Sequence, residues 1–323
     1  MIKPRVLNLT PISQINGLIE YLSDFFVVEN MPYPDSPDAI PNKQEYEAIF
    51  INPNMSKLYL DKHFLRDFKN LKVIATASTG LTHIDLEYLK EMRIELISLT
   101  TDFDFINQIS STAEHAFALT LEGLRNLKSA NDSVINGKWE YLPFIGRQIS
   151  KLTFGVIGYG RLGKFYAKYA HAFGATVLVY DPYVKVQNIE IMKQVSRIED
   201  IFVNSDVVSL HVHVNPETTN LINESVLAKA KETLLLVNTS RGEIVSDLDL
   251  IAFLEKNPKA KYSTDVLNNE ARGLFNNPIF QYSLETSQIF ISPHIGGMTE
   301  DAQKIAYFRT AEKLRNYFSE WTK

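Results

Sequence analysis

Cysteine is absent from the 323-residue sequence. Without thiols the chain has no disulfide bond, no thiolate nucleophile, no iron–sulfur cluster and no zinc site built on sulfur. This absence fits a reducing compartment, and we expect a cytoplasmic protein. Long apolar runs are absent too, because stretches such as Phe25–Val28 and Thr233–Val237 fall far short of the roughly 18 residues that cross a membrane. We therefore expect neither a transmembrane segment nor a membrane partner.

An excess of positive charge is also missing. The chain has 33 Lys and Arg against 38 Asp and Glu, which gives a net charge of −5. This balance argues against nucleic acid or an anionic membrane surface as the main partner. Hydrophobic residues make up 45% and charged residues 22%, as in ordinary globular chains, so a disordered or fibrous protein is excluded. At about 150 residues per domain, the length favours two domains.

Strand-like and helix-like patterns alternate along the chain in two separate series. The first series has predicted strands at Arg5–Leu9, Phe25–Glu29, Glu47–Ile51, Val73–Ala77 and Ile94–Ser98. The second has them at Thr153–Ile157, Thr176–Tyr180, Val207–His211, Leu234–Asn238, Tyr262–Val266 and Ile289–Ser292. A helical pattern at residues 108–126 joins the two series, and another at Thr299–Trp321 ends the chain. Such alternation indicates parallel sheets with helices on both faces.

A glycine-rich turn opens the second series. Residues 158–163 read GYGRLG, a GxGxxG pattern directly after a predicted strand and before a predicted helix. The first glycine forms a tight turn, the second lets the backbone approach a pyrophosphate, and the third lets helix and strand pack closely. Asp181 ends the next strand, 23 residues after Gly158 (181 − 158), where an acid binds the ribose hydroxyls of NAD and repels the 2′-phosphate of NADP. The alternative is a turn with incidental glycines, but this context favours an NAD site.

These patterns predict an α/β protein with two doubly wound parallel-sheet domains. The apolar residues of the final helical pattern must pack on another element, and domain termini often lie close together. We therefore expect the last helix to return to the first domain. The predicted arrangement is a Rossmann NAD-binding domain at residues 108–295, inserted into a flavodoxin-like substrate domain made of residues 1–107 and 296–323.

Three charged residues, Arg241, Glu270 and His294, follow predicted strands of the second series. Such strand ends form the ligand-binding edge of a doubly wound sheet. Hydride transfer between NAD and a 2-hydroxy acid needs a cation for the carboxylate, a proton donor and acceptor near neutral pH, and an acid that orients it. Arginine, histidine and glutamate supply these functions. Each residue alone is more often a solvated loop residue, so the prediction depends on their joint placement.

Longer motifs surround these residues. They are FGVIGYGRLGK, VYDPY, SDVVSLHV, LLLVNTSRGEIV, TDVLNNE and ISPHIGGMT in residues 150–300, and ASTGLTHIDL and STAEHAFAL before them. With these motifs the sequence resembles the D-isomer-specific 2-hydroxyacid dehydrogenases, which include D-lactate, D-glycerate and D-3-phosphoglycerate dehydrogenases. The resemblance implies an NAD-dependent oxidoreductase that transfers a hydride between nicotinamide and C2 of a D-2-hydroxy acid or 2-oxo acid.

The resemblance also implies the catalytic and substrate-binding residues. Arg241 would bind the substrate carboxylate, and His294 paired with Glu270 would be the general acid and base. Three backbone amides would bind the substrate carboxylate as well, those of Ser78, Thr79 and Gly80. The family resemblance implies no metal site.

A larger set of residues would bind the cofactor. Asp265 would contact the nicotinamide carboxamide, and Thr112 would lie under the cofactor. Val212 and His213 would line the adenine pocket. The complete set comprises Thr112, Gly158, Gly160, Arg161, Leu162, Gly163, Asp181, Val212, His213, Thr218, Thr239, Asp265 and Gly297.

The sequence departs from the family pattern at three positions. His213 and Ala271 stand where proline is frequent, and His83 replaces a frequent asparagine in the substrate loop. His211 and His213 face the same side of a strand, so a metal pair is conceivable, but no third ligand is evident. His115, in the helical pattern at residues 108–126, is expected to be a hydrogen-bonded core histidine.

Two other functions stay open. An NAD(H)-sensing, co-repressor-like binding module would share the fold and the three charged residues, although the sequence lacks a disordered tail suited to it. D-3-phosphoglycerate dehydrogenase is the other possible activity. A phosphate needs cations beyond Arg241, and Ile51–Asn54 holds no arginine, with Lys57 the nearest positive charge. We therefore expect a small 2-oxo acid with an uncharged side chain, such as glyoxylate, hydroxypyruvate or pyruvate.

The segment at residues 120–150 is the expected dimer contact. It carries an apolar set made of Trp139, Tyr141, Leu142, Phe144 and Ile145, as interfaces do. The family resemblance implies dimerisation through this region, so we expect a homodimer.

Overall fold

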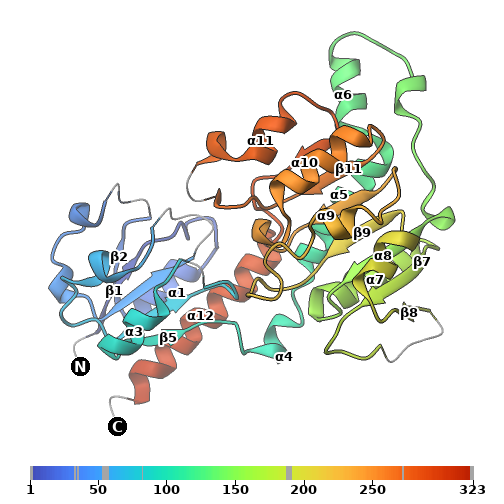
Figure 1. The fold of residues 1–323 in the computed structure, drawn as a ribbon. Helices are drawn as coiled ribbons and strands as arrows, with labels where there is room; N and C mark the ends of the chain where they lie inside the picture. The colour runs from blue at the N-terminus through green and yellow to red at the C-terminus, as the bar shows by residue number, and fades with distance from the viewer. Residues whose placement is uncertain are drawn as a thin grey trace. The chain divides into compact units, whose positions relative to one another are not determined.

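The chain forms two compact units in the computed structural model (Figure 1). The structure describes residues 3–32, 34, 36–52, 58–81, 83–186, 191–270 and 273–320. Unit 1 consists of Met1–Ile109 and Met298–Lys323, and unit 2 consists of Ser110–Gly297. Each boundary lies two residues after the one expected from the sequence. Among the helices of the described residues, none is long and apolar enough to span a bilayer.

Unit 1 is built on a five-stranded parallel sheet with the order β2-β1-β3-β4-β5. Its strands are β1 (Arg5–Asn8), β2 (Val27–Asn30), β3 (Ala48–Ile51), β4 (Val73–Thr76) and β5 (Glu95–Ile97). Its helices are α1 (Leu18–Phe25), α2 (Lys62–Leu65), α3 (Leu86–Met92), α4 (Phe103–Ile106) and α12 (Glu300–Glu320), with short 3-10 turns η1 (Pro37–Ala39) and η2 (Lys43–Glu45). This strand order is the flavodoxin-like one, so the predicted fold of this unit is confirmed.

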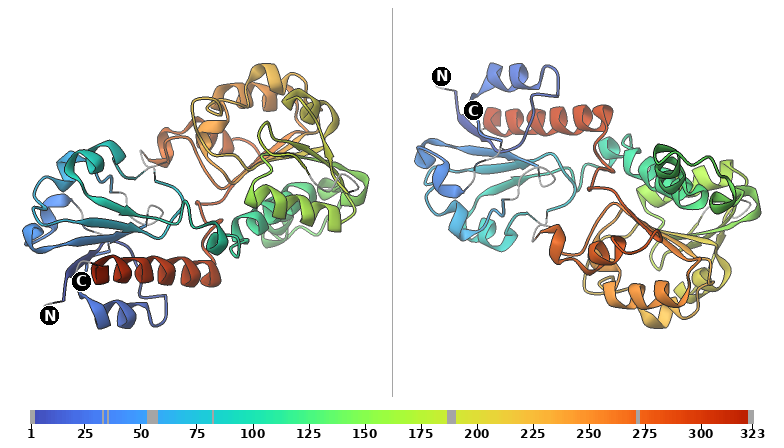
Figure 2. Two further views of the ribbon diagram at one scale, coloured as in Figure 1. Left: turned by 90° about the horizontal axis from the view of Figure 1, so that it is seen from below. Right: turned by 90° about the horizontal axis from the view of Figure 1, so that it is seen from above.

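The final helix, α12, packs on the sheet of unit 1 beside α1 (Figure 2). Its buried residues include Tyr307, Leu314 and Phe318. The ring of Tyr307 lies 6.0 Å from that of Phe50 on β3. The return of the chain to its first domain is thereby confirmed, while Trp321 at the end of the predicted helix lies outside the described residues.

Unit 2 contains a seven-stranded parallel sheet with the order β12-β11-β10-β9-β6-β7-β8. Its strands are β6 (Thr153–Ile157), β7 (Thr176–Tyr180), β8 (Lys193–Gln194), β9 (Val207–Leu210), β10 (Leu235–Asn238), β11 (Lys261–Thr264) and β12 (Ile289–Ile291). Its helices are α5 (Ser111–Arg125), α6 (Leu127–Ile135), α7 (Arg161–Ala172), α8 (Ile198–Asn204), α9 (Glu224–Leu227), α10 (Asp247–Lys256) and α11 (Pro278–Ser283). The 3-10 turns of the unit whose bounds lie within the described residues are η3 (Leu142–Phe144), η4 (Ile149–Lys151), η5 (Gly242–Ile244) and η7 (Leu274–Asn276).

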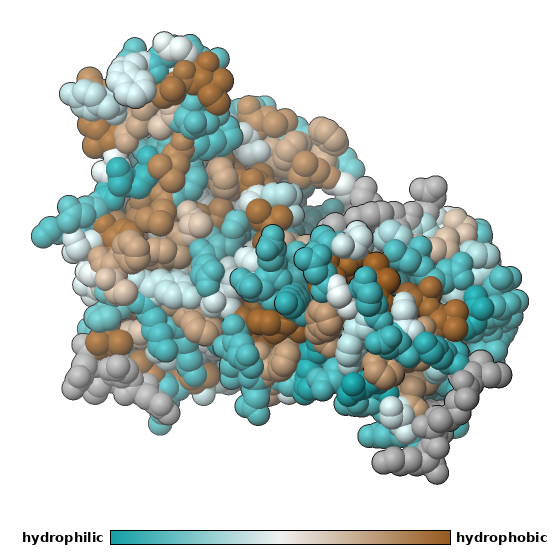
Figure 3. Space-filling view, turned by 180° about the vertical axis from the view of Figure 1, so that it is seen from behind, coloured by the Kyte–Doolittle hydropathy of each residue, from teal (hydrophilic) through white to brown (hydrophobic). Residues whose placement is uncertain are grey.

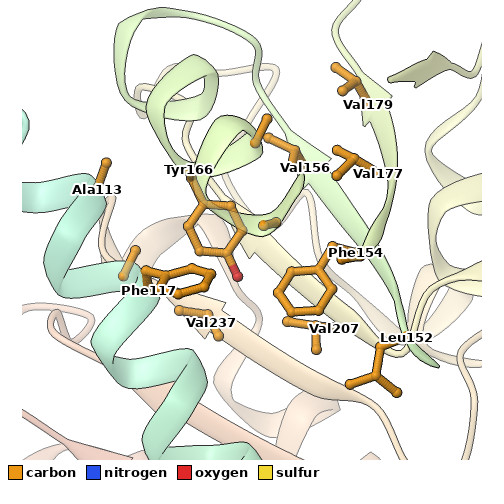
Figure 4. Close-up of a cluster of buried hydrophobic side chains, with 14 of the residues drawn as sticks. Ala113, Phe117, Leu152, Phe154, Val156, Tyr166, Val177, Val179, Val207 and Val237 are labelled. Carbon is orange, nitrogen blue, oxygen red and sulfur yellow. The ribbon is translucent and has the colours of Figure 1, made fainter. Parts of the chain in front are cut away.

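Both faces of this sheet are buried, because successive strand residues point to opposite sides. Val207 packs in the cluster beneath α5 and α7, whereas Val208 packs in the cluster on the other face. Figure 4 shows the first cluster, in which Phe117, Phe154 and Tyr166 meet above the strands. Each such side chain contributes about 1.5–3 kcal/mol on full burial. This packing fixes α7, and with it the glycine-rich turn, against the sheet.

Candidate active site

The glycine-rich turn links β6 to α7, and two of its glycines leave no room for a side chain. Gly158 has a φ of +91°, and a Cβ there would lie 2.5 Å from the carbonyl oxygen of His211. A Cβ at Gly163 would lie 1.9 Å from the carbonyl oxygen of Gly158. Gly160 differs, since nothing lies within 4 Å of its Cβ position. The backbone is therefore closely packed at Gly158 and Gly163, whereas the space beside Gly160 is open. No side chain caps the start of α7 at Gly160.

Asp181, just after β7, is fixed beside this turn by backbone hydrogen bonds. Its Oδ2 accepts from the amide of Tyr159 at 2.7 Å. Its Oδ1 accepts from the amides of Tyr183 at 2.8 Å and Val184 at 2.9 Å. The negative charge expected from the sequence is thus placed next to the glycine-rich turn.

The residues after β9 also lie at this turn. The Cγ1 of Val212 would be 2.7 Å from a Cβ at Gly158, so these two residues are in close contact. The carbonyl oxygen of His213 accepts a 2.6 Å hydrogen bond from Thr218 Oγ1. Among the described residues, no group of three or more His, Asp and Glu side chains could hold a metal ion.

Three residues of the turn itself, Arg161, Leu162 and Gly163, belong to α7. Leu162 is partly buried against the core, and burial lowers the pKa of the Arg161 guanidinium from its ordinary value. Elsewhere, the Thr239 hydroxyl after β10 is buried and has no hydrogen-bond partner within the described residues. An unpaired buried hydroxyl at the ligand-binding edge is a group that a bound molecule can satisfy.

Arg241 lies on the turn after β10, and close backbone packing holds this turn. A Cβ at Gly242 would lie 2.1 Å from the amide nitrogen of Asn268, so only glycine fits. The Nη1 of Arg241 donates to the carbonyl oxygen of Ser240 at 2.6 Å. The Arg241 turn therefore packs against the segment that leads to Glu270. No hydrogen bond or ion pair joins Arg241 to Glu270 or His294 in the described parts of the chain.

His294 and Glu270 form a direct pair, with Nδ1 of His294 2.5 Å from Oε1 of Glu270. The imidazole is 26% exposed and the carboxylate 42% exposed, so the pair faces solvent in unit 2. His294 has a φ of +55°, a left-handed conformation that costs a non-glycine residue about 1–2 kcal/mol. With Nδ1 bound to the carboxylate, Nε2 is left to contact a ligand.

Asp265, just after β11, lies beneath the loop that carries His294. Its side chain is buried, and its oxygens accept from the amides of Ile295 at 2.9 Å and Gly296 at 2.7 Å. Ser292 Oγ donates to it at 2.5 Å, and His115 Nε2 lies 3.2 Å away. Burial alone would raise the pKa of Asp265, but these hydrogen bonds together hold the pKa below its usual value.

The sequence did not indicate this bonding of Asp265. Asp265 was expected to contact the nicotinamide, yet most of its hydrogen bonding is directed at residues 292–296. Ser292 was not identified as a site residue at all, although it directly precedes Pro293 and His294 in the ISPHIGG motif. Thr112 packs against the same loop, because its Cγ2 lies 3.2 Å from the Cβ position of Gly296. At Gly297 nothing lies within 4 Å of the Cβ position.

Unit 1 carries the remaining predicted residues, Ser78, Thr79 and Gly80, one residue beyond the end of β4. Ser78 Oγ donates to the carbonyl oxygen of Gly80 at 2.7 Å. Thr100 Oγ1 donates to the carbonyl oxygen of Thr79 at 3.1 Å. These contacts bend the loop into a fixed turn after the strand.

A buried histidine supports this turn from below. Thr76 Oγ1 lies 3.0 Å from Ser78 Oγ and 3.2 Å from His83 Nε2. Since the carbonyl of Gly80 can only accept, Ser78 donates to it, Thr76 donates to Ser78, and Nε2 of His83 must carry the hydrogen. Burial lowers the pKa of His83 to about 4, so the ring is neutral at physiological pH.

Comparison with known proteins gives a consistent result. Residues 117–296 match the family model described as "D-isomer specific 2-hydroxyacid dehydrogenase, NAD binding domain". The chain is 32% identical over 281 residues to the D-3-phosphoglycerate dehydrogenase of Synechocystis sp., covering 86% of this chain and 48% of that protein. It is 31% identical to the hydroxypyruvate reductase of Thermotoga maritima, covering 76% of this chain and 77% of that protein.

The chain spans about half the length of the D-3-phosphoglycerate dehydrogenases that it matches, 48% of the Synechocystis protein and 53% of that from Mycobacterium tuberculosis. Among solved structures, the D-lactate dehydrogenase of Aquifex aeolicus, complexed with NAD and lactic acid, is similar. The TM-score is 0.82 with 26% identity, and the match covers 98% of this chain and 96% of that one.

Proposed function

Because the chain belongs to the D-isomer-specific 2-hydroxyacid dehydrogenase family, we propose that it transfers a hydride between NAD and C2 of a small D-2-hydroxy acid or 2-oxo acid. The observation that carries this proposal is the His294–Glu270 pair, joined at 2.5 Å. It follows strands of the same sheet that bears the glycine-rich turn and Arg241. Ligand binding in such sheets occurs at the carboxyl ends of the strands.

The described residues fit NAD. The open side of Gly160 and the uncapped start of α7 suit a pyrophosphate, which backbone amides at a helix N-terminus bind well. Asp181 lies beside the turn with Oδ2 accepting only one hydrogen bond from the described residues, so this oxygen can accept another from a ribose hydroxyl. The same charge disfavours a 2′-phosphate, and we therefore propose a preference for NAD over NADP.

Bound NADH would supply the hydride for C2 of the oxo acid. Arg241 would bind the substrate carboxylate, for which its planar guanidinium provides two parallel N–H donors. Nε2 of His294 would donate a proton to the oxygen on C2 as the carbonyl becomes a hydroxyl. Glu270 would hold the hydrogen on Nδ1 and stabilise the charged imidazole before this transfer. In the oxidation direction, neutral His294 would accept the same proton.

The side-chain specificity is proposed from unit 1. Neutral polar side chains lie at or just after the carboxyl ends of β1, β3 and β4, among them Asn8, Thr10, Asn52, Thr76 and Ser78. Lys57, the nearest cation in the sequence, lies outside the described residues. A neutral, polar surrounding suits a small 2-oxo acid such as hydroxypyruvate, glyoxylate or pyruvate better than a phosphorylated one. D-3-phosphoglycerate dehydrogenase is the second candidate, because relatives of that name are 32% identical to this chain.

Steady-state kinetics separate these two activities. We expect a higher kcat/KM with hydroxypyruvate than with phosphohydroxypyruvate, in each case with NADH. A clear preference for the phosphorylated acid would contradict the proposed specificity for an uncharged side chain. That result would mean that a cation such as Lys57 binds the phosphate. The chain would then act as a D-3-phosphoglycerate dehydrogenase.

We also propose a homodimer formed through the arm at residues 127–148. In this arm Trp139 is 90% exposed and Ile145 71% exposed, and α6 contains no buried residue. Figure 3 shows apolar side chains gathered on the projection that carries α6. Contiguous exposed apolar side chains favour a protein partner, and a second copy of this chain would cover the arm of each by symmetry.

A further inference from the structure

The loop that carries His294 is joined to α5 by a short chain of polar side chains. His115 lies on α5, Ser292 directly follows β12, and Asp265 directly follows β11. His115 Nε2 lies 2.8 Å from Ser292 Oγ, and Ser292 Oγ lies 2.5 Å from Asp265 Oδ1. Three elements that are distant in sequence therefore meet beneath His294.

Asp265, at one end of this chain of side chains, determines which group donates each hydrogen bond. The pKa of Asp265 is held below its usual value by its hydrogen bonds, although burial opposes this, so the carboxylate is ionised and can only accept. Ser292 must then donate its hydrogen to Asp265, and its oxygen accepts from His115. Nε2 of His115 consequently carries a hydrogen. Since Nε2 also lies 3.2 Å from Asp265 Oδ1, the histidine contacts both partners.

Through Asp265, this chain of side chains is linked to Ile295 and Gly296, the two residues that follow His294. Asp265 accepts from the amides of Ile295 and Gly296, and the amide of His294 donates to the carbonyl oxygen of Ser292 at 3.0 Å. A Cβ at Gly296 would lie 3.0 Å from Asp265 Oδ2, so the loop sits directly on the carboxylate. The left-handed backbone of His294, with a φ of +55°, needs such support, because strained residues persist only where their surroundings fix them.

We propose that His115 and Ser292 are positioning residues, which hold Asp265 so that it clamps the loop and aims the His294 imidazole at the substrate. This proposal rests on the proposed role of His294 as general acid and base. His115 and Ser292 themselves touch neither substrate nor cofactor in it. Without the hydroxyl of Ser292 or the donor of His115, the carboxylate loses partners and the loop loses its fixed geometry.

Three variants test the proposal, with three measurements on each. His115→Leu and Ser292→Ala remove a hydrogen-bonding group, whereas His115→Gln keeps an N–H donor. The measurements are kcat for 2-oxo acid reduction, the Kd for NADH, and amide hydrogen exchange of Ile295 and Gly296 in the free protein. We expect His115→Leu and Ser292→Ala to lower kcat about tenfold or more, as misplacement of a catalytic group does. We expect the Kd for NADH to change by less than about threefold, and exchange at the two amides to accelerate.

The Gln variant and a control separate positioning from general destabilisation. His115→Gln should recover most of kcat and of the amide protection, because its amide can donate in place of Nε2. His171→Leu, at an exposed histidine of α7, should leave all three measurements unchanged. Ser292→Ala removes only one oxygen and keeps the test valid if His115→Leu does not fold.

Two results would overturn the proposal. One is a wild-type kcat in both His115→Leu and Ser292→Ala, and the other is unchanged exchange at Ile295 and Gly296 in these variants. If the wild type reduces no 2-oxo acid, the proposed function fails, but the exchange measurement on the free protein still decides whether His115 and Ser292 fix the loop.

Discussion

His83 is the buried titratable side chain whose environment is simplest to interpret. Its Nε2 bonds to Thr76 Oγ1, while its Nδ1 is buried without a partner in the described part of the chain. Burial lowers its pKa from 6.5 to about 4. The unfolded chain therefore binds a proton at His83 below about pH 6.5, whereas the folded unit binds this proton only below about pH 4. The stabilising effect is complete above pH 6.5 and is lost as the pH falls through this window.

We predict that unit 1 loses about 2 kcal/mol of unfolding free energy between pH 7 and pH 5 through His83 alone. The variant His83→Asn, which can still bond to Thr76, should lack this loss. Urea unfolding at the two pH values measures it, with His63→Asn as a control at an exposed histidine of the same unit. An equal pH effect in wild type and His83→Asn would show that His83 is accessible to protons in the folded state.

At this scale the sequence predicted residue types better than contacts. Glu270 and His294 were expected to pair, and the structure joins them at 2.5 Å. The contacts of Asp265 with Ser292 and the loop amides could not be predicted. They depend on how β11 and β12 align side by side, and a single sequence does not contain that register.

Among the elements, the turn between β6 and α7 combines two different requirements for glycine. Gly163 is required by the protein, because a Cβ there would lie 1.9 Å from the Gly158 carbonyl oxygen. Gly160 is not, because its φ of −75° suits any residue and nothing lies within 4 Å of its Cβ position. Glycine at position 160 is therefore required only by the proposed contact with the pyrophosphate.

We therefore predict opposite outcomes for two alanine substitutions. Gly163→Ala should lower the melting temperature by several degrees, since a clash with backbone costs about 1–3 kcal/mol. Gly160→Ala should melt like the wild type but raise the Kd for NADH about tenfold or more, because the methyl group lies where the backbone approaches the pyrophosphate. Fluorescence titration with NADH and thermal unfolding provide the two readouts. A Gly160→Ala protein that binds NADH normally would place the pyrophosphate elsewhere.

Most elements could be predicted because the apolar pattern repeats with the period of a strand or helix. The predicted strand at Thr153–Ile157 coincides with β6. The predicted strand at Phe25–Glu29 is wrong by two residues at its start, because Phe25 ends the amphipathic helix α1. The two-residue β8 was missed, since it carries no apolar run and exists only through pairing with β7. The helical pattern at 108–126 ends as α5 at Arg125, because Asn126 adopts a left-handed φ of +55°.

At the scale of the whole molecule, the arm at residues 127–148 exposes apolar side chains, and the single chain gives no reason for this exposure. Its apolar side chains are exposed, with Tyr141 at 78% and Leu142 at 68%. Since these side chains are mostly exposed in the single chain, charge placed there costs the monomer little. Their proposed role is contact with a second copy.

We predict that the double variant Trp139→Glu, Ile145→Glu is a folded monomer, whereas the wild type has twice the monomer mass. Burying two unpaired carboxylates in an interface costs several kcal/mol, which is enough to dissociate an ordinary dimer. Sedimentation equilibrium gives the masses. Tyr183→Glu, at a residue of unit 2 that is 78% exposed outside the arm, should remain dimeric. A wild type that sediments as a monomer, or a double variant that stays dimeric, would contradict this interface.

The central claim is that His294, paired with Glu270, gives and takes the proton while NADH reduces a 2-oxo acid. The most direct measurement compares wild type and His294→Ala for NADH oxidation with hydroxypyruvate, glyoxylate and pyruvate, alongside NADH binding by fluorescence. The account predicts turnover of at least one acid by the wild type, a kcat about 10² lower in His294→Ala, and the same Kd for NADH in both. Equal turnover by the two proteins, or no NADH oxidation with any of the acids by a wild type that binds NADH, would contradict it.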